Sequence, residues 1–349
     1  GEMVVEVGPA WRSKKSALRG PLPQSVREVI RARLSRLSAE ASELVRAGAV
    51  LERGFDFESV VGVAGLGEAE GLRGLDELIE RHLVQEEASG REEEEQLLHP
   101  SATYSFTHEK IRQVAYTEMG HARRRLLHRR AFEVLEEGGA PAAQLARHAL
   151  EGGLAEQAFR YGVAAGDAAV EVFSVKDAIE HYERARDLLT EIRTGSRQLI
   201  EPSVPDLEHL YIQLGRAYEL PEEWDKAREA YEAMLALAGE VEEARLEVGA
   251  LNNLAVLAFH QESDPPRARR LLEEARGVAE EAELEEWLVE TECTLADVMT
   301  YGAGAFEHSG RLARKALASA RALEARPDLI ARALETLARL ELFRGRLEE

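Results

Sequence analysis

The sequence predicts an all-α protein with one small β-hairpin, in which a compact helical domain precedes a solenoid of stacked helical hairpins. Apolar residues make up 45% of the 349 residues but aromatic residues only 6%, so alanine and leucine carry the hydrophobicity, as suits packed helices. Apolar positions recur at helical spacing along most of the chain. In the second half, small residues recur about every 40 residues, which is the pattern of a repeat protein.

Composition and charge exclude several classes of protein. The formal charge is −21, which argues against direct nucleic-acid binding because phosphates are bound by clustered Lys and Arg. The single cysteine, Cys293, excludes an internal disulfide and a cysteine-rich zinc site. Apolar stretches are too short to span a bilayer, and the first residues lack the pattern of a signal peptide. We therefore expect a cytoplasmic protein with no membrane partner.

The pattern divides the chain into three segments. Residues 1–22 are irregular and basic, and we interpret them as a linker from an upstream domain. Residues 23–137 form a helical domain, and residues 138–349 form a repeat arm that begins at the GGAP break. The last residues, GRLEE, suggest the start of another helix. We therefore expect the chain to be a piece of a longer polypeptide, cut within its repeat arm.

The middle segment, with its following helices, has the element order of a winged helix. Helical spacing predicts helices over 22–37 and 39–51, and residues 54–63 are expected to be a short connector with room for a single turn. A third helix is expected near Glu68–Arg81, with Leu72, Leu75, Leu78 and Ile79 on one side. The only hairpin is expected to pair Leu83–Glu87 with Thr103–Thr107 across a polar tip, before two helices over His108–Met119 and His121–Glu137.

Small residues at equivalent places predict the hairpins of the repeat arm. Gly215, Ala255, Ala296 and Ala338 are 40, 41 and 42 residues apart, and Ala165 holds the equivalent place in an earlier unit. In each complete unit, a second small residue lies 12 or 13 residues after the first small residue. These second residues are Ala178, Ala227, Ala268 and Ser309. Small residues let the two helices of a hairpin approach closely. One hairpin cannot bury its apolar faces alone, so neighbouring hairpins must stack.

The hairpin around Gly215 resembles the tetratricopeptide signature. The residues that carry the resemblance are Leu214, Gly215, Tyr218, Trp224, Ala227 and Tyr231. The period of about 40 exceeds that family's usual period of about 34, which points to a variant with longer helices. The expected fold is therefore a winged helix followed by an α-solenoid of tetratricopeptide-like helical hairpins.

The front half resembles the region that follows the nucleotide-binding domain in bacterial signalling ATPases of the STAND class. The segments LPQSVREVIRARLSRLS, FDFESVVGV, LDELIERHLVQEE, YSFTHEKIRQVAY and ARRRLLHRRAFEVLE occur in that order, and the resemblance covers about residues 20–190. It implies a winged helix that restrains an ATP- or ADP-bound core and repeats that detect an inducer or a protein partner, in transcription regulation. No G-x-x-x-x-G-K-[ST] stretch occurs, so we expect the ATPase core upstream and no cofactor in this piece.

His108 is the candidate nucleotide-sensing residue. It lies in FTHE, where a predicted strand meets a helix, and an imidazole at a helix N-terminus adds a donor beside free backbone N–H groups. The sequence resembles the Met-His-Asp type motif of this ATPase class, which implies contact with the β-phosphate of ADP when the upstream domain is present. The alternative is that Thr107 caps the helix and His108 simply packs.

Other candidate sites have structural interpretations that we favour. The basic stretch at residues 121–130 could bind phosphate, but we expect a helix with Leu126, Leu127 and Ala131 inward and its arginines paired with acidic neighbours. The predicted third helix and the wing tip are acidic and would repel DNA. Neither an H-E-x-x-H pair nor a G-x-S-x-G elbow occurs, so we expect no enzyme activity, no catalytic residue and no metal site. Cys293 is expected to be a buried small residue.

The inner groove of the repeat arm is the candidate partner-binding site. The first helix of each hairpin is expected to line it, on the flank away from the small residue. The expected lining is His209, Ile212, Arg216, Glu219, Asn252, Val256, Phe259, Glu290, Cys293, Asp297, Thr300, Arg332, Glu335 and Arg339. This mixture of charges suits an extended peptide or a polar protein surface better than an apolar small molecule. A solvated inner face without a ligand is the alternative.

These observations predict the non-catalytic regulatory and sensor arm of a nucleotide-switched signalling protein. The alternative is a free-standing tetratricopeptide adaptor, in which the winged helix is only a structural cap. The sequence leaves open the inducer or partner, the effector domain and the oligomeric state.

Overall fold

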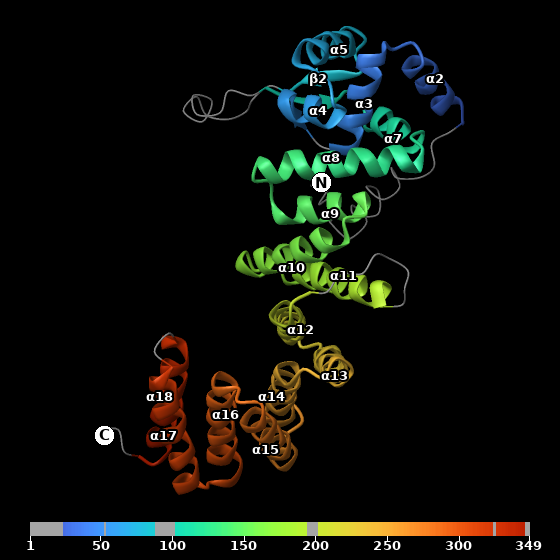
Figure 1. The fold of residues 1–349 in the computed structure, drawn as a ribbon. Helices are drawn as coiled ribbons and strands as arrows, with labels where there is room; N and C mark the ends of the chain where they lie inside the picture. The colour runs from blue at the N-terminus through green and yellow to red at the C-terminus, as the bar shows by residue number, and fades with distance from the viewer. Residues whose placement is uncertain (1–23, 52–53, 88–101, 194–201, 324–325, 346–349) are drawn as a thin grey trace, which may run out of the picture. The chain divides into compact units, whose positions relative to one another are not determined.

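The computed structural model describes residues 24–51, 54–87, 102–193, 202–323 and 326–345. These residues form sixteen helices and three short strands. Figure 1 shows the helices in their order along the chain. The chain divides into two compact units, residues 1–154 and residues 155–349. The first unit holds the sheet, and the second unit is wholly helical in its described residues.

The first unit contains the predicted winged helix. Its elements are α3 (Ala39–Leu51), β1 (Phe55–Asp56), α4 (Phe57–Ala64), α5 (Glu68–Glu80), β2 (Val84–Glu86) and β3 (Thr103–Phe106). Strands β2 and β3 pair antiparallel, with Val84 opposite Phe106, which confirms the predicted hairpin. The sheet has the order β1-β3-β2, and Phe55 lies opposite Tyr104.

The prediction of a short connector over residues 54–63 is wrong, because this segment contains strand β1 and most of helix α4. Phe55 is buried, and its ring lies 6.1 Å from that of Phe106, so apolar packing holds this two-residue strand on the hairpin. Asp56 then caps α4 by accepting a 2.7 Å hydrogen bond from the backbone N–H of Ser59. Gly65, in the left-handed region at φ 73°, ends the helix.

Helix α5 is rotated relative to the predicted face. Leu75 and Leu78 are buried as expected, but Leu72 and Ile79 are 48% and 37% exposed. Glycines occupy the rest of the buried face because the neighbouring helices come very close. A Cβ on Gly74 would lie 2.8 Å from Leu44 Cδ1, and a Cβ on Gly71 would lie 2.4 Å from Val61 Cγ2.

Four further helices complete the first unit: α2 (Gln24–Leu34), α7 (Glu109–Thr117), α8 (His121–Glu137) and α9 (Ala142–Gly152). Helices α8 and α9 form a hairpin that packs within this unit. The Nε groups of Arg125 and Arg129 donate to the backbone carbonyl of Gly152 at 3.1 and 2.8 Å, which ties the end of α9 to α8. The compact unit thus extends to Leu154, whereas the sequence pattern places the start of the repeat arm at Gly138.

The second unit is the predicted solenoid of helical hairpins. Its helices are α10 (Ala155–Glu171), α11 (Val175–Arg193), α12 (Val204–Glu219), α13 (Trp224–Val241), α14 (Ala244–His260), α15 (Pro265–Glu281), α16 (Glu285–Ala303), α17 (Phe306–Ala322) and α18 (Pro327–Phe343). Each helix packs against the next. Four of the five aligned small residues are buried, whereas Ala338 on the last described helix is exposed.

The small residues set the distance between paired helices. A Cβ on Gly215 would lie 2.2 Å from the ring of Tyr231, so only glycine lets α12 and α13 pack here. Tyr231 is fully buried, and its hydroxyl donates to Glu219 at 2.8 Å. Burial and the neighbouring carboxylate raise the pKa of this phenol, which therefore stays a neutral donor.

Candidate functional site

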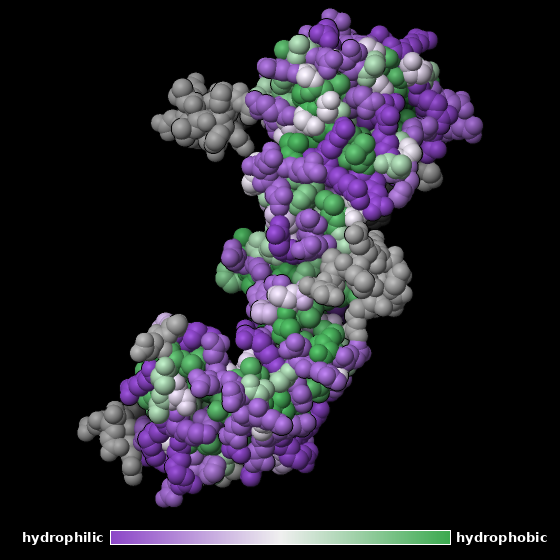
Figure 2. Space-filling model, in the orientation of Figure 1, coloured by the Kyte–Doolittle hydropathy of each residue, from purple (hydrophilic) through white to green (hydrophobic). Residues whose placement is uncertain are grey.

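A polar groove of about 660 Å³ lies on the repeat arm, along α12, α14, α16 and the start of α18. These are the first helices of successive hairpins, which are the elements expected to line the inner face. The lining residues are Pro205, Glu208, His209, Ile212, Gln213, Arg216, Arg245, Asn252, Asn253, Val256, Glu286, Trp287, Glu290, Thr294, Arg326, Leu329 and Arg332. On the face drawn in Figure 2, hydrophilic side chains cover most of this arm.

Seven of the predicted groove residues converge on this cavity. They are His209, Ile212, Arg216, Asn252, Val256, Glu290 and Arg332. Ile212, Val256 and Trp287 add apolar surface to the lining. The groove therefore combines charged walls with a partly apolar floor, a lining suited to an amphipathic ligand.

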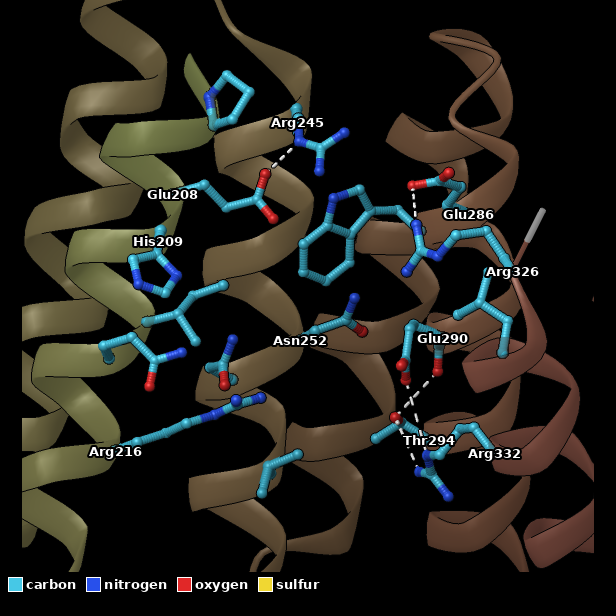
Figure 3. Close-up of a pocket in the computed structure, with 17 residues that line it drawn as sticks. Glu208, His209, Arg216, Arg245, Asn252, Glu286, Glu290, Thr294, Arg326 and Arg332 are labelled. Carbon is cyan, nitrogen blue, oxygen red and sulfur yellow. Dashed lines mark hydrogen bonds and ion pairs between the residues drawn. The ribbon is translucent and has the colours of Figure 1, made fainter. Parts of the chain in front are cut away.

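Ion pairs fix the walls by joining α12 to α14 and α16 to α18. Arg245 on α14 pairs with Glu208 on α12, and Arg326, at the start of α18, pairs with Glu286 on α16. Arg332 on α18 lies 3.0 Å from Asp297 and 3.6 Å from Glu290, both on α16. The dashed lines in Figure 3 mark several of these contacts.

Asn252 lies near the middle of the groove and is 94% buried, since only 6% of its surface is exposed. Its Nδ2 donates to the hydroxyl oxygen of Thr291 at 2.8 Å. The Thr291 hydroxyl in turn donates to the backbone carbonyl of Trp287 at 2.7 Å. The Thr291 proton is thereby committed, so the amide must present its NH₂ group to this hydroxyl. Asn252 Oδ1 is buried without a hydrogen-bond donor among the described residues.

His209 and Arg216 on α12 differ in their surroundings. The Nε2 of His209 lies 2.9 and 3.0 Å from the two carboxylate oxygens of Asp167 on α10, which holds the imidazole at the rim. Arg216 is exposed and makes no hydrogen bond or ion pair with any described residue. Figure 3 shows its side chain extending from α12 toward the middle of the groove. Its charge is therefore available to a ligand.

The other predicted groove residues do not line this cavity. Glu219 accepts from Tyr231, Asp297 is held by Arg332 and Arg339, Glu335 pairs with Arg339, Phe259 packs on Tyr301, and Cys293 and Thr300 are buried. Burial raises the pKa of Cys293 to about 12. These residues lie in the middle or toward the C-terminal ends of their helices, whereas the cavity extends about one turn nearer the N-terminal ends.

Sequence reasoning missed the charged residues of that N-terminal turn. Glu208, Arg245, Glu286 and Arg326 occur once per first helix and alternate in sign, 37, 41 and 40 residues apart. This spacing follows the repeat period. Alternating charge at the repeat period is thus the sequence signal that locates the groove.

His108 occupies the N-cap of α7 with extended backbone at φ −144°, and its side chain is exposed. Thr107 does not cap the helix, because its hydroxyl donates to the backbone carbonyl of His82 at 3.0 Å. The alternative in which Thr107 caps and His108 packs is therefore wrong. Contact between His108 and a nucleotide stays a prediction.

The basic stretch on α8 is used within the fold. Arg125 and Arg129 bind the carbonyl of Gly152 at the end of α9, and Arg130 binds that of Ala64 at the end of α4, where helix carbonyls lack partners. Arg123 pairs with Glu43 at 2.6 Å. Leu127 and Ala131 are inward as predicted, but Leu126 is 47% exposed. Most of the arginine partners are backbone carbonyls, whereas the sequence led us to expect acidic side chains.

A second polar cluster lies between α7, α8 and α9. The two Nδ1 atoms of His128 and His148 are 3.1 Å apart, and both side chains are fully buried. Arg147 donates to His148 Nε2 at 2.8 Å, and His128 Nε2 lies 3.0 Å from the Tyr116 hydroxyl. Burial lowers the pKa of His128 to about 4 and that of His148 to about 3. This cluster is a neutral hydrogen-bonded core element.

Two further classes of site are absent from the described residues. No group of three or more His, Cys, Asp or Glu side chains there is arranged to hold a metal ion. No described helix is both long and apolar enough to cross a membrane.

Comparison with known proteins gives structural similarities at low sequence identity. No family profile and no curated protein matches the chain. A STAND protein with a tetratricopeptide repeat sensor from Pyrococcus horikoshii aligns at TM-score 0.40 and 12% identity, over 93% of this chain and 58% of that chain. BtubC from P. vanneervenii aligns at TM-score 0.44 and 20% identity, over 66% of this chain and 87% of that chain. The chain thus spans just over half the length of the first of these proteins.

Proposed function

We propose that this chain is the regulatory and sensor arm of a nucleotide-switched signalling protein, with a repeat groove that binds a peptide or protein partner. One observation carries the proposal. Three sets of ion pairs preform the walls of the groove, while the Arg216 charge and the buried Asn252 Oδ1 have no partner among the residues that the structure describes. A merely solvated inner face has no need for a buried acceptor without a donor.

The winged helix supports the switching part of the proposal. In a longer polypeptide with an ATPase domain, it would restrain the nucleotide-bound core, as the sequence resemblance implies. His108 is exposed at a helix N-terminus, where an imidazole and free backbone N–H groups favour a phosphate. The chain itself is proposed to be non-catalytic, with ATP or ADP held by the other domain and transcription as the regulated output.

Peptide selection tests the groove. A phage-displayed library of random peptides is selected on the parent chain and counter-selected on the double variant Arg216→Ala/Asn252→Ala. We expect peptides that bind the parent and lose at least about tenfold in affinity with the variant, since hydrogen bonds to a charged group and to a buried acceptor are lost. The melting temperature should change little. Failure to recover any peptide that depends on these two residues would contradict the proposal.

His108→Ala tests the switching role in a polypeptide that includes the ATPase domain. We expect weaker ADP binding and a shift toward the active state, with His121→Ala, an exposed histidine on α8, as the matched control. Unchanged ADP affinity and unchanged output would remove the sensing role. If the groove variant still loses peptide binding in that case, the chain is better described as an adaptor whose winged helix is a structural cap.

A further inference from the structure

We infer that a pocket between the start of α17 and the end of α18 binds a small aromatic phosphate, with arginines on the phosphate and phenylalanines on the ring. The pocket has a volume of about 630 Å³, and its lining is Phe306, Glu307, Arg311, Arg314, Phe343 and Arg344. It shares no residue with the groove, which reaches α18 at Leu329 and Arg332, near the other end of that helix. The inference therefore goes beyond the proposed function and does not depend on it.

The charge of the pocket is opposite to that of the chain. Helix α17 carries four cationic residues and one acidic residue, Glu307, in a chain with a formal charge of −21. Arg311 and Arg314 are exposed and lie three positions apart, so both project from the same side of the helix. Arg311 contacts the imidazole of His308 at 3.2 Å, and neither arginine has a carboxylate partner among the described residues. Two guanidinium groups are thus available to one oxyanion, and a phosphate dianion matches their charge.

The aromatic walls of the pocket are held in place. The Nη2 of Arg344 donates to the backbone carbonyl of Phe306 at 2.6 Å and its Nη1 donates to Glu341 at 3.2 Å, which ties the end of α18 to the start of α17. Phe343 is 52% exposed, and its ring lies 4.6 Å from that of Tyr301, nearly perpendicular to it. An exposed ring that is already ordered offers apolar surface to a ligand at little cost in entropy. A phosphate that carries an aromatic ring can use this surface, whereas inorganic phosphate cannot.

The equivalent place one repeat earlier shows that the fold does not require these residues. A pocket of about 430 Å³ lies there, between α15 and α16, and it stays open although α17 and α18 follow it in the chain. The positions 41 residues before the two phenylalanines and Arg314 hold Pro265, Gly302 and Glu273. The same packing thus forms with a proline, a glycine and a glutamate. The rings and the second arginine of the later pocket therefore serve a purpose other than packing.

Titration of the full chain with phenyl phosphate tests the inference. Binding is measured by calorimetry in about 0.15 M salt, with inorganic phosphate as the probe without a ring and benzyl alcohol as the probe without a charge. We expect saturable binding of phenyl phosphate and at least about fivefold weaker binding of each control. Absence of phenyl phosphate binding, or equal affinity for inorganic phosphate, would overturn the inference.

Variants that copy the earlier pocket assign the contacts with residues that this fold already accommodates. Arg314→Glu should lower the affinity for phenyl phosphate at least about tenfold, because a cation on the phosphate becomes an anion. Phe306→Pro, which suits the first turn of a helix, should lower it toward the affinity for inorganic phosphate. The melting temperature of each variant checks that it is folded.

Two control variants separate this pocket from other sources of binding. Arg321→Glu makes the same change of charge in the exposed last turn of α17, and Arg216→Gln removes a cation from the groove. Both should leave the affinity for phenyl phosphate unchanged. An unchanged affinity in Arg314→Glu, an equal loss in Arg321→Glu, or a loss in Arg216→Gln alone would each overturn the inference while leaving the proposed function intact.

Discussion

Lowering the pH from 7 to 5 should weaken the packing of α9 on α8 in the first unit, because His128 and His148 are buried there without charge. Arg147 can only donate, so His148 Nε2 accepts and His148 carries its proton on Nδ1. That proton points to His128 Nδ1, and His128 in turn donates from Nε2 to the Tyr116 hydroxyl. A second proton on either ring would place two donors against each other.

The surrounding charges oppose protonation as well. Arg124 and Arg147 both lower the pKa of His128, and Arg147 and His128 lower that of His148, in addition to the larger effect of burial. The folded pKa values, about 4 and about 3, lie below the ordinary value of 6.5. The unfolded chain therefore binds more protons below pH 6.5, so stability is complete above that pH and is lost as the pH falls.

The size of the effect follows from proton linkage. Between pH 6.5 and pH 5, each imidazole gains a proton only in the unfolded chain, which costs about 1.4 kcal/mol per pH unit and therefore about 2 kcal/mol per imidazole at pH 5. The two rings together would weaken the α8–α9 hairpin by up to about 4 kcal/mol, a large share of the stability of a typical domain.

Amide hydrogen exchange measured by mass spectrometry, corrected for the intrinsic effect of pH, is the assay. Peptides covering residues 142–152 should lose protection between pH 7 and pH 5 in the parent. The double variant His128→Gln/His148→Gln, which cannot titrate, should lose this pH dependence, whereas His121→Gln should keep it. Equal protection of α9 at both pH values, or an unchanged pH dependence in the double variant, would refute the reasoning.

Three further predictions concern packing and catalysis. Gly215→Ala should lower the free energy of unfolding, measured by thermal unfolding, by about 2 kcal/mol because the new Cβ meets Tyr231. Gly239→Ala, which has nothing within 4 Å of its Cβ position, should raise it by up to about 1 kcal/mol. A stabilising Gly215→Ala with a destabilising Gly239→Ala would contradict the packing argument. Lys315→Met should cost about 3 kcal/mol because Glu292, 2.6 Å away with 1% of its side chain exposed, loses its cation, and adding Glu292→Leu should restore most of that stability. The rate of ATP hydrolysis with the purified chain should equal the rate in buffer alone. ATPase activity that copurifies with the chain through every column would contradict this prediction.

The repeat arm could be predicted from sequence because its helix spacing depends on which side chains are small. Gly215 and Ala255 mark where a partner helix packs, and this information is local and periodic. The rotation of α5 could not be predicted from its leucines. The contact of Gly74 with Leu44 decides it, and that contact joins residues distant in sequence.

Strand β1 and the position of the groove also depend on contacts between residues that are distant in sequence, so neither could be predicted from a local pattern. Phe55 becomes part of a strand only because Tyr104 lies opposite, across the whole winged helix. The groove was predicted on the correct helices but about one turn too far along each, since periodicity gives the face of a helix and not the height at which neighbouring helices separate. That height depends on pairs such as Glu208 with Arg245, which the individual helices do not reveal.

The ion pairs between successive first helices also have a mechanical consequence. Repeat proteins have contacts only between neighbours, so their stiffness is a property of each joint. Here the joints α12–α14 and α16–α18 each carry an electrostatic tie at one end of the helices, at Glu208–Arg245 and Glu286–Arg326. Exposed charges are screened by salt. The arm should therefore become more flexible as the ionic strength rises, separately at each pair of helices. The groove would widen first at the ion pair that is most exposed to solvent.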